Sequence, residues 1–126
     1  MLQLEVVGYA DAEPLGYYRV HLPADIGRPI VARLVRAQKS GKASFNMILE
    51  QLKQIHGLTA VRAVQSYEAA LADHRGAEVL DIRPRSPVIA STRIIYTDNE
   101  LPVEYDEILY RGDRYRFTIR RIYSLT

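Results

Sequence analysis

The stretch from Pro87 to Tyr123 constrains the fold most, because apolar and polar residues alternate through it with the period of a β-strand. Turn-forming residues interrupt it twice, at residues 97–100 (Thr-Asp-Asn-Glu) and 111–113 (Arg-Gly-Asp). The pattern predicts three antiparallel strands in a sheet with one apolar face. The third of these strands would run from Tyr115 to Tyr123.

The rest of the 126-residue chain adds elements of both kinds around this stretch. We expect strands over residues 4–9, 15–22 and 59–70, and helices over residues 44–56, 73–80 and onward from Pro29 as a first helical residue. Tyr9-Ala-Asp11-Ala-Glu13 repeats the spacing of Tyr96-Thr-Asp98-Asn-Glu100, which predicts two equivalent hairpins. The order of elements predicts a single α+β domain with an antiparallel β-sheet and flanking helices.

Composition excludes several classes of protein. The chain has no cysteine, its formal charge is only +2, and its three histidines are scattered without a metal-ligand spacing. It has no phosphate-binding glycine loop and no nucleophile elbow. Its start lacks the features of a secretory signal, and no apolar run is long enough to span a membrane. We therefore expect a cytoplasmic protein with no metal, no cofactor and no membrane association.

The second predicted strand of the opening stretch carries the best candidates for chemistry. Glu104, Asp106 and Tyr110 share one parity and should project from the same face of the sheet. Two carboxyl groups together suggest an acid–base site. The alternative is a solvated face, where both carboxylates lie beside the arginines of the next strand.

Arginines interleaved with aromatic residues follow this strand and raise the possibility of nucleic-acid binding. The parity places Tyr115 and Phe117 on one face and Arg114 and Arg116 on the other. We therefore interpret the aromatic residues as part of the core.

Two runs in this region resemble the C-terminal half of a known domain family. They are Tyr96-Thr-Asp98-Asn-Glu-Leu-Pro102-Val-Glu104-Tyr and Tyr110-Arg-Gly-Asp113-Arg-Tyr115-Arg-Phe117, preceded by Pro87-Val88. They resemble the UTRA domain, the effector-binding module of HutC-type regulators in the GntR family, which is similar in fold to chorismate lyase. The resemblance extends over residues 4–121.

The resemblance implies that residues 1–126 form one effector-binding and dimerisation domain and not an enzyme. A small metabolite would bind it and modulate DNA binding by a winged-helix domain. The chain shows no helix-turn-helix pattern, so we expect that the DNA-binding domain is absent from it and that DNA is contacted only through that domain. The partners implied are a metabolite effector and a second copy of the chain.

The resemblance also implies which residues contact the effector. Glu104 matches the glutamate of the family's P-V-E motif, and Tyr110 matches the tyrosine six residues later. Ser44, at the start of a helix that it can also cap, matches an effector-binding serine, and Asn46 lies two residues after it.

The first hairpin departs from the family pattern. Members that bind phosphorylated sugars carry an R-x-R pair that falls here on Val6 and Gly8, and a glutamate that falls on Tyr18. Without both guanidinium groups the site lacks a bidentate anion clamp. We therefore expect a smaller or less anionic effector that contacts Gly8 and is held partly by Tyr17 or Tyr18.

Two other functions remain open from the sequence. One is an enzyme of the chorismate lyase type, in which Glu104 acts as an acid or orients the substrate and Arg93 is the one obvious arginine for an anionic substrate. The other is an oligomerisation module without a ligand, in which Glu104 and Tyr110 merely pair with arginines.

Overall fold

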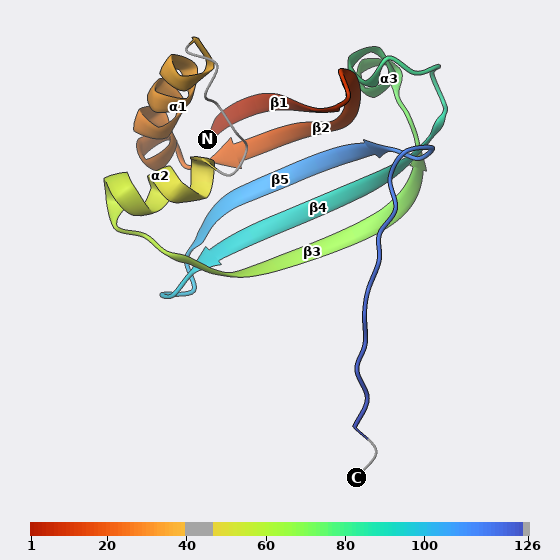
Figure 1. Cartoon of the computed structure of the whole chain (residues 1–126). Helices are drawn as coiled ribbons and strands as arrows, with labels where there is room; N and C mark the ends of the chain where they lie inside the picture. Colours follow the sequence, from red (N-terminus) through yellow and green to blue (C-terminus); the bar gives the residue numbers. More distant parts are fainter. Residues whose placement is uncertain (40–46, 125–126) are drawn as a thin grey trace.

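The computed structural model describes residues 1–39 and 47–124, which form an antiparallel sheet with helices at both ends (Figure 1). The five-stranded sheet has the order β1-β2-β5-β4-β3. The strands are β1 (Leu2–Ala10), β2 (Glu13–Leu22), β3 (Ala60–Leu71), β4 (Pro87–Thr97) and β5 (Pro102–Arg111), and the helices are α1 (Ala24–Lys39), α2 (Met47–His56) and α3 (His74–Leu80). The predicted α+β fold is confirmed.

Two hairpins, β1–β2 and β4–β5, make up four of the five strands of the sheet, as the repeated spacing predicts. The β1–β2 turn places Asp11 and Ala12 at positive φ, and the β4–β5 turn does the same with Glu100. The hairpins join through β2 and β5, where Val20 lies opposite Asp106. This pairing puts β5 in the middle of the sheet.

The core is divided between the two faces of the sheet, which corrects the prediction of one apolar face. At one end α1 and α2 pack on a cluster that includes Val20 and Ile95. At the other end α3 packs on a cluster that includes Tyr17 and Val88 (Figure 1). Val88 and Ile95 have opposite parity on β4, so their side chains point to opposite faces of the sheet. Strand β4 is therefore buried on one face near one end and on the other face near its other end. We call the two faces the α1/α2 face and the α3 face.

Helix α1 begins five residues before the predicted start at Pro29. Ile30 is fully buried and Ile26 packs against the same cluster, four residues earlier on the same side of the helix. The amide of Gly27 donates to the carbonyl of Pro23 at 2.8 Å. Burial of this apolar stripe therefore stabilises a first turn ahead of Pro29, although Pro29 removes one backbone hydrogen bond inside the helix.

Helices α2 and α3 agree with the sequence prediction where the structure describes them. Gly57 follows α2 with φ of +67°, and Ile48 and Leu52 are buried beneath the helix. The side chain of Asp73 caps α3 by accepting from the amide of Gly76 at 2.7 Å. In the described part of the chain, no helix has both the length and the apolar character that crossing a membrane requires.

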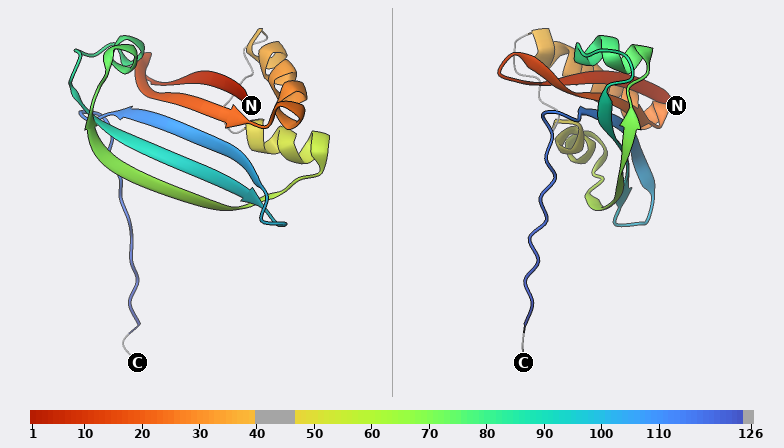
Figure 2. Two further views of the ribbon diagram at one scale, coloured as in Figure 1. Left: turned by 180° about the vertical axis from the view of Figure 1, so that it is seen from behind. Right: turned by 90° about the vertical axis from the view of Figure 1, so that its right-hand side faces the viewer.

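The predicted third strand after β5 is wrong. Residues 115–124 are described, yet they form no strand and extend away from the sheet (Figure 2). Both edges of β5 are already paired, one with β2 and the other with β4. A strand that follows β5 through a tight turn therefore has no free edge beside it.

Two leucines on α2 give a matched test of this core. Leu52→Ala, at a position 2% exposed, should lower the free energy of unfolding by about 2–5 kcal/mol, because it leaves a cavity. Leu49→Ala, at a position 38% exposed, should lower it by less than about 1 kcal/mol. Urea denaturation measures both. Equal losses would contradict the placement of α2.

Candidate functional site: a buried carboxyl pair and an aromatic cluster

The predicted carboxyl residues project from β5 toward the α1/α2 face. The strand register places Arg93 of β4 opposite Asp106, and Ile95 opposite Glu104. On the other side of β5, Val20 lies opposite Asp106. Since Val20 and Ile95 belong to the cluster under α1 and α2, the two carboxyl groups lie within the covered part of this face.

Arg93 pairs chiefly with Asp106. Its Nη2 and Nε atoms lie 2.6 Å and 2.8 Å from Asp106 Oδ2, whereas Nη2 is 3.5 Å from Glu104 Oε2. The side chain of Asp106 is fully buried and that of Glu104 is 3% exposed. One guanidinium group therefore faces two buried carboxyl groups, and Glu104 is the less well paired of the two.

One oxygen of each carboxyl group has no partner among the described residues. These atoms are Glu104 Oε1 and Asp106 Oδ1. Leaving a buried polar atom without a hydrogen bond costs about 1–3 kcal/mol. Such atoms are uncommon in folded proteins, and polar groups of a bound ligand would satisfy them.

Burial raises the pKa of Glu104 to about 9, and the adjacent Asp106 carboxyl adds to this shift. The Arg93 guanidinium acts in the opposite direction but does not offset the burial. Glu104 is therefore protonated at neutral pH in the folded chain. It can donate one hydrogen bond, or release its proton when a cation approaches.

These contacts exclude one of the two interpretations of the carboxyl pair. A solvated face beside the arginines of a following strand is excluded, because both groups are buried and their arginine comes from the preceding strand, β4. A perturbed pKa next to a specific charged partner is typical of functional sites.

The other predicted β5 residue, Tyr110, belongs to an aromatic cluster farther along the same face. Its ring stacks on Tyr115 at a centroid distance of 4.1 Å and meets Tyr18 edge-on at 5.9 Å. Tyr67 of β3 contacts Phe117 at 4.6 Å. Burial and the neighbouring Tyr18 raise the pKa of Tyr110, so its hydroxyl stays protonated at neutral pH. We call Tyr18, Tyr67, Tyr110, Tyr115 and Phe117 the aromatic cluster.

Two glycines make room for the ring of Tyr18. A Cβ atom added at Gly8 would lie 3.2 Å from Tyr18 Cε2, and one added at Gly16 would lie 3.1 Å from it. The ring thus lies against the backbone of β1 and β2, where Gly8 would otherwise carry a side chain. Tyr17, the other aromatic candidate, points to the α3 face and is buried there, so it does not belong to this site.

The predicted residues do not all meet at one point. Glu104 and Tyr110 are six residues apart on β5, which corresponds to about 20 Å along a strand. Tyr18 and Gly8 lie at the Tyr110 end. Ser44 and Asn46 fall outside the described residues. The described part of the site is therefore an elongated strip of the α1/α2 face.

Several neighbours in this strip were missed by the sequence analysis. Gln65 donates to Ser91 at 3.0 Å beside Arg93, and Gly16 and Tyr67 border the aromatic cluster. These neighbours lie on the same face as the strip because β3 pairs with β4 and β2 pairs with β5. A local pattern of residues does not reveal which strands pair, so only a correct prediction of the strand order would have found them.

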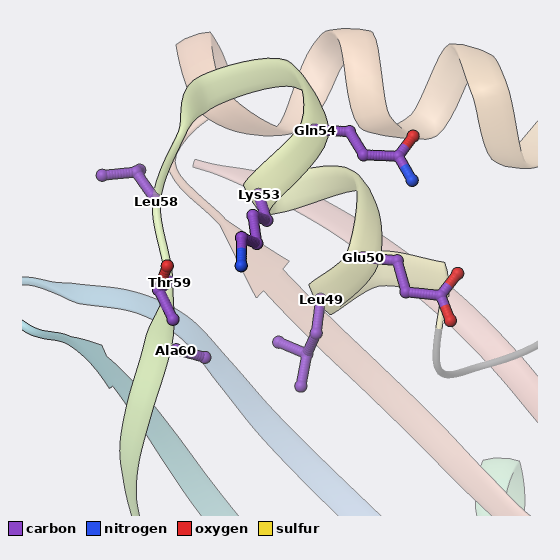
Figure 3. Close-up of a pocket in the computed structure, with 7 residues that line it drawn as sticks. All are labelled: Leu49, Glu50, Lys53, Gln54, Leu58, Thr59 and Ala60. Atoms are coloured by element: carbon purple, nitrogen blue, oxygen red, sulfur yellow. The ribbon is translucent and has the colours of Figure 1, made fainter.

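A separate groove of about 350 Å³ lies between α2 and the segment that leads into β3 (Figure 3). It is lined by residues of α2 and of the segment leading into β3, namely Leu49, Glu50, Lys53, Gln54, Leu58, Thr59 and Ala60. It contains neither the carboxyl pair nor the aromatic cluster. Among residues 1–39 and 47–124, no three metal-ligating side chains gather into a group.

The raised pKa predicts how stability changes with pH. The unfolded chain releases the Glu104 proton near the ordinary value of 4.5, whereas the folded chain keeps it to about pH 9. Stability contributed by this group is therefore present at low pH and is lost progressively as the pH rises between these values. Glu104→Gln mimics the protonated group and should remove this loss.

The measurement is urea denaturation of both proteins at pH 5.5 and pH 8. Glu104→Gln should become more stable relative to the native chain by at least about 1 kcal/mol over this interval, because one pKa unit corresponds to ~1.4 kcal/mol. Glu68→Gln, at an exposed position on β3, serves as the control. A Glu104→Gln difference that is independent of pH would contradict a protonated Glu104.

Comparisons with known proteins relate this geometry to transcriptional regulators. All five strands of the sheet, which lie between residues 2 and 111, fall within a match to the UTRA domain model, which covers residues 1–116. The chain is 36% identical over 62 residues to the HTH-type transcriptional repressor PhnF of Mycolicibacterium smegmatis, covering 49% of this chain and 25% of that protein. It is 28% identical over 103 residues to the HTH-type transcriptional repressor NagR of Bacillus subtilis, covering 79% of this chain and 42% of that protein.

Solved structures show the same fold. The crystal structure of PhnF from Mycobacterium smegmatis matches with a TM-score of 0.76 and 26% identity, over 97% of this chain and 50% of that one. The C-terminal domain of Yurk from Bacillus subtilis matches with a TM-score of 0.80 and 20% identity, over 94% and 77% of the two chains. The chain spans less than half the length of the two curated relatives. It belongs to the UTRA domain family, the ligand-binding regulatory domains of GntR-family transcriptional regulators.

Proposed function

We propose that this chain is the effector-binding and dimerisation domain of a HutC-type regulator and that its effector binds along the strip between Glu104 and Tyr110. The observation that carries the proposal is the buried carboxyl pair with one unpaired oxygen on each group. A polar ligand would satisfy both atoms, because it would accept from the protonated Glu104, or displace that proton with a cationic donor, and it would donate to Asp106. The likeness to repressors supports sensing as the purpose of this binding.

The charges of the strip indicate the chemistry of the effector. Two carboxyl groups face one guanidinium group, and that group already lies 2.6 Å from Asp106. The positions where phosphate-binding members carry arginines hold Val6 and Gly8, and the ring of Tyr18 lies against Gly8. A neutral or cationic metabolite with hydroxyl or amino groups fits this strip better than a sugar phosphate does.

The same charges favour sensing over catalysis of the chorismate lyase type. An anionic substrate needs a free cationic partner, and Arg93 is already engaged by Asp106. In the proposed function the domain is part of a cytoplasmic homodimer, and a winged-helix domain elsewhere in the regulator reads DNA. The effector would change DNA affinity through a coupling of about 1–3 kcal/mol between the two sites.

A thermal-shift screen tests ligand binding directly. The panel contains amino acids, amines, neutral sugars, sugar phosphates and aromatic acids. A ligand at about 100 times its dissociation constant adds ~2.7 kcal/mol to the stability of the native state. We expect neutral or cationic metabolites to raise the thermal stability of the domain. Stabilisation by sugar phosphates alone would contradict the proposed chemistry, and no shift with any class would contradict the proposed site.

Variants locate the site once a ligand is found. Glu104→Gln keeps the shape of the protonated acid but cannot become an anion. It should therefore lower the affinity for a cationic ligand by at least about tenfold, or ~1.4 kcal/mol. Tyr110→Phe should lower the affinity for any ligand that forms a hydrogen bond with the Tyr110 hydroxyl. Calorimetric titration measures both, with Glu68→Gln as the control. Unchanged affinity in both variants would show that the ligand binds outside the strip between Glu104 and Tyr110.

A further inference from the structure

A polar pair, Gln65 and Ser91, lies between the carboxyl pair and the aromatic cluster on the α1/α2 face. Gln65 of β3 lies opposite Arg93 of β4, which lies opposite Asp106 of β5, so these side chains form one row across the sheet. Ser91 of β4 belongs to the next row, opposite Tyr67 of β3. Side chains that lie opposite each other in such a row are ~4.5–5.5 Å apart at Cβ. The polar pair therefore connects the carboxyl end of the strip with its aromatic end.

One hydrogen bond holds the two side chains together. Gln65 Nε2 donates to Ser91 Oγ at 3.0 Å, and Ser91 is 2% exposed. An amide group carries two N–H donors and a carbonyl acceptor, and a serine hydroxyl carries a donor as well as acceptor sites. Within residues 1–39 and 47–124, neither side chain makes a second hydrogen bond. The carbonyl oxygen of Gln65 and its second N–H can therefore bind another partner.

The fold does not need this polar pair for its stability. Replacing both partners of a hydrogen bond by apolar groups of similar shape can be nearly neutral for stability. The rows on either side are apolar where they cross β3 and β4, with Ala63 opposite Ile95 in one row and Ala69 opposite Ile89 in the other. On these two strands, polar side chains face α1 and α2 only in the rows that continue into the strip.

The amide of Gln65 offers a donor and an acceptor side by side, and a hydroxyl group can bind both. A hydroxyl donates one hydrogen bond and accepts others. The bond to Ser91 holds one N–H of Gln65, so the amide keeps one orientation and presents its carbonyl oxygen and its other N–H together. Gln65 is partly exposed, so a ligand in the strip can reach it.

We propose that Gln65 is a specificity-determining residue that binds a hydroxyl group of the effector, and that Ser91 positions its amide. This inference rests on the proposed function, because it concerns the same strip. It narrows the effector to a metabolite with a hydroxyl group beside the amino or hydroxyl group that meets the carboxyl pair. A site built to bond a hydroxyl discriminates strongly against an analogue without it, because the analogue leaves polar groups of the site unpaired.

Two matched pairs of small molecules test this specificity. Serinol and 3-aminopentane are cations of the same shape, in which the hydroxyl groups of serinol take the place of methyl groups. The neutral pair is myo-inositol and cyclohexanol, and the single hydroxyl of cyclohexanol cannot meet Gln65 and the carboxyl pair at once. Titration of the ¹⁵N-labelled chain, followed by nuclear magnetic resonance, measures the four dissociation constants. It also reports on the side-chain amide of Gln65, whose signal is assigned by its loss in Gln65→Met.

We expect the hydroxylated member of at least one pair to bind at least about tenfold more tightly than its analogue. Its binding should also shift the side-chain amide signal of Gln65. The analogue should leave this signal in place, because it has no group that bonds the amide while it occupies the carboxyl end.

Variants show which residues cause the discrimination. Gln65→Met keeps the length of the side chain without its amide, so it should abolish the preference for the hydroxylated member and leave the affinity for the analogue unchanged. Ser91→Ala should reduce the same preference, because the amide loses its fixed orientation. A purely structural role of Ser91 would instead change the affinity for both members equally. Gln3→Met, at an exposed position of β1 opposite His21 on the α3 face, is the matched control. Urea denaturation verifies that each variant is folded.

The outcomes separate this inference from the proposed function. A preference that persists in Gln65→Met, or equal affinity for both members of each pair, would overturn the role of Gln65 and leave the proposed strip intact. Failure of all four compounds to bind would also overturn it. The thermal-shift screen then reports independently on the proposed function, which fails only if no class of metabolite, or sugar phosphates alone, stabilises the domain.

Discussion

The pairing of β2 with β5 is the constraint on which the rest of this structure depends. It joins two hairpins into one sheet and places β5 between two partners. Residues at the centre of β5 are then covered by neighbours on both sides and by α1 and α2 above them. The burial of Glu104 and Asp106 follows from this position, as does the absence of room for another strand beside β5.

Burial gives the carboxyl pair its chemical character. On an exposed edge strand the same two residues would be ordinary carboxylates. In the centre of the sheet one arginine is too little to compensate both, so Glu104 keeps its proton and two oxygens stay without partners among the described residues. In the proposed function such a site is preformed, because the sheet fixes its backbone, and it selects a ligand whose polar groups match the protonated Glu104 and the free oxygen of Asp106.

Local sequence patterns predicted most elements of the fold and much of the strip. Strand alternation predicted β1–β5 and the shared face of Glu104 and Tyr110, and the predicted helices 44–56 and 73–80 end where α2 and α3 end. The alternation at Tyr115, Phe117 and Ile119 was misleading, since a strand also needs a free edge, and the edge depends on the sheet order. The start of α1 was misplaced because the burial of Ile26 and Ile30 outweighs the preference of proline for a first turn.

The most direct test of this account is the protonation state of Glu104 in the folded chain. The carboxyl carbon shift of Glu104, assigned by its loss in Glu104→Gln, can be followed by nuclear magnetic resonance as the pH is raised. The account predicts a midpoint well above pH 7, because burial disfavours the charged form. A midpoint near 4.5 would show a solvated carboxylate and would contradict the buried pair as the basis of ligand recognition.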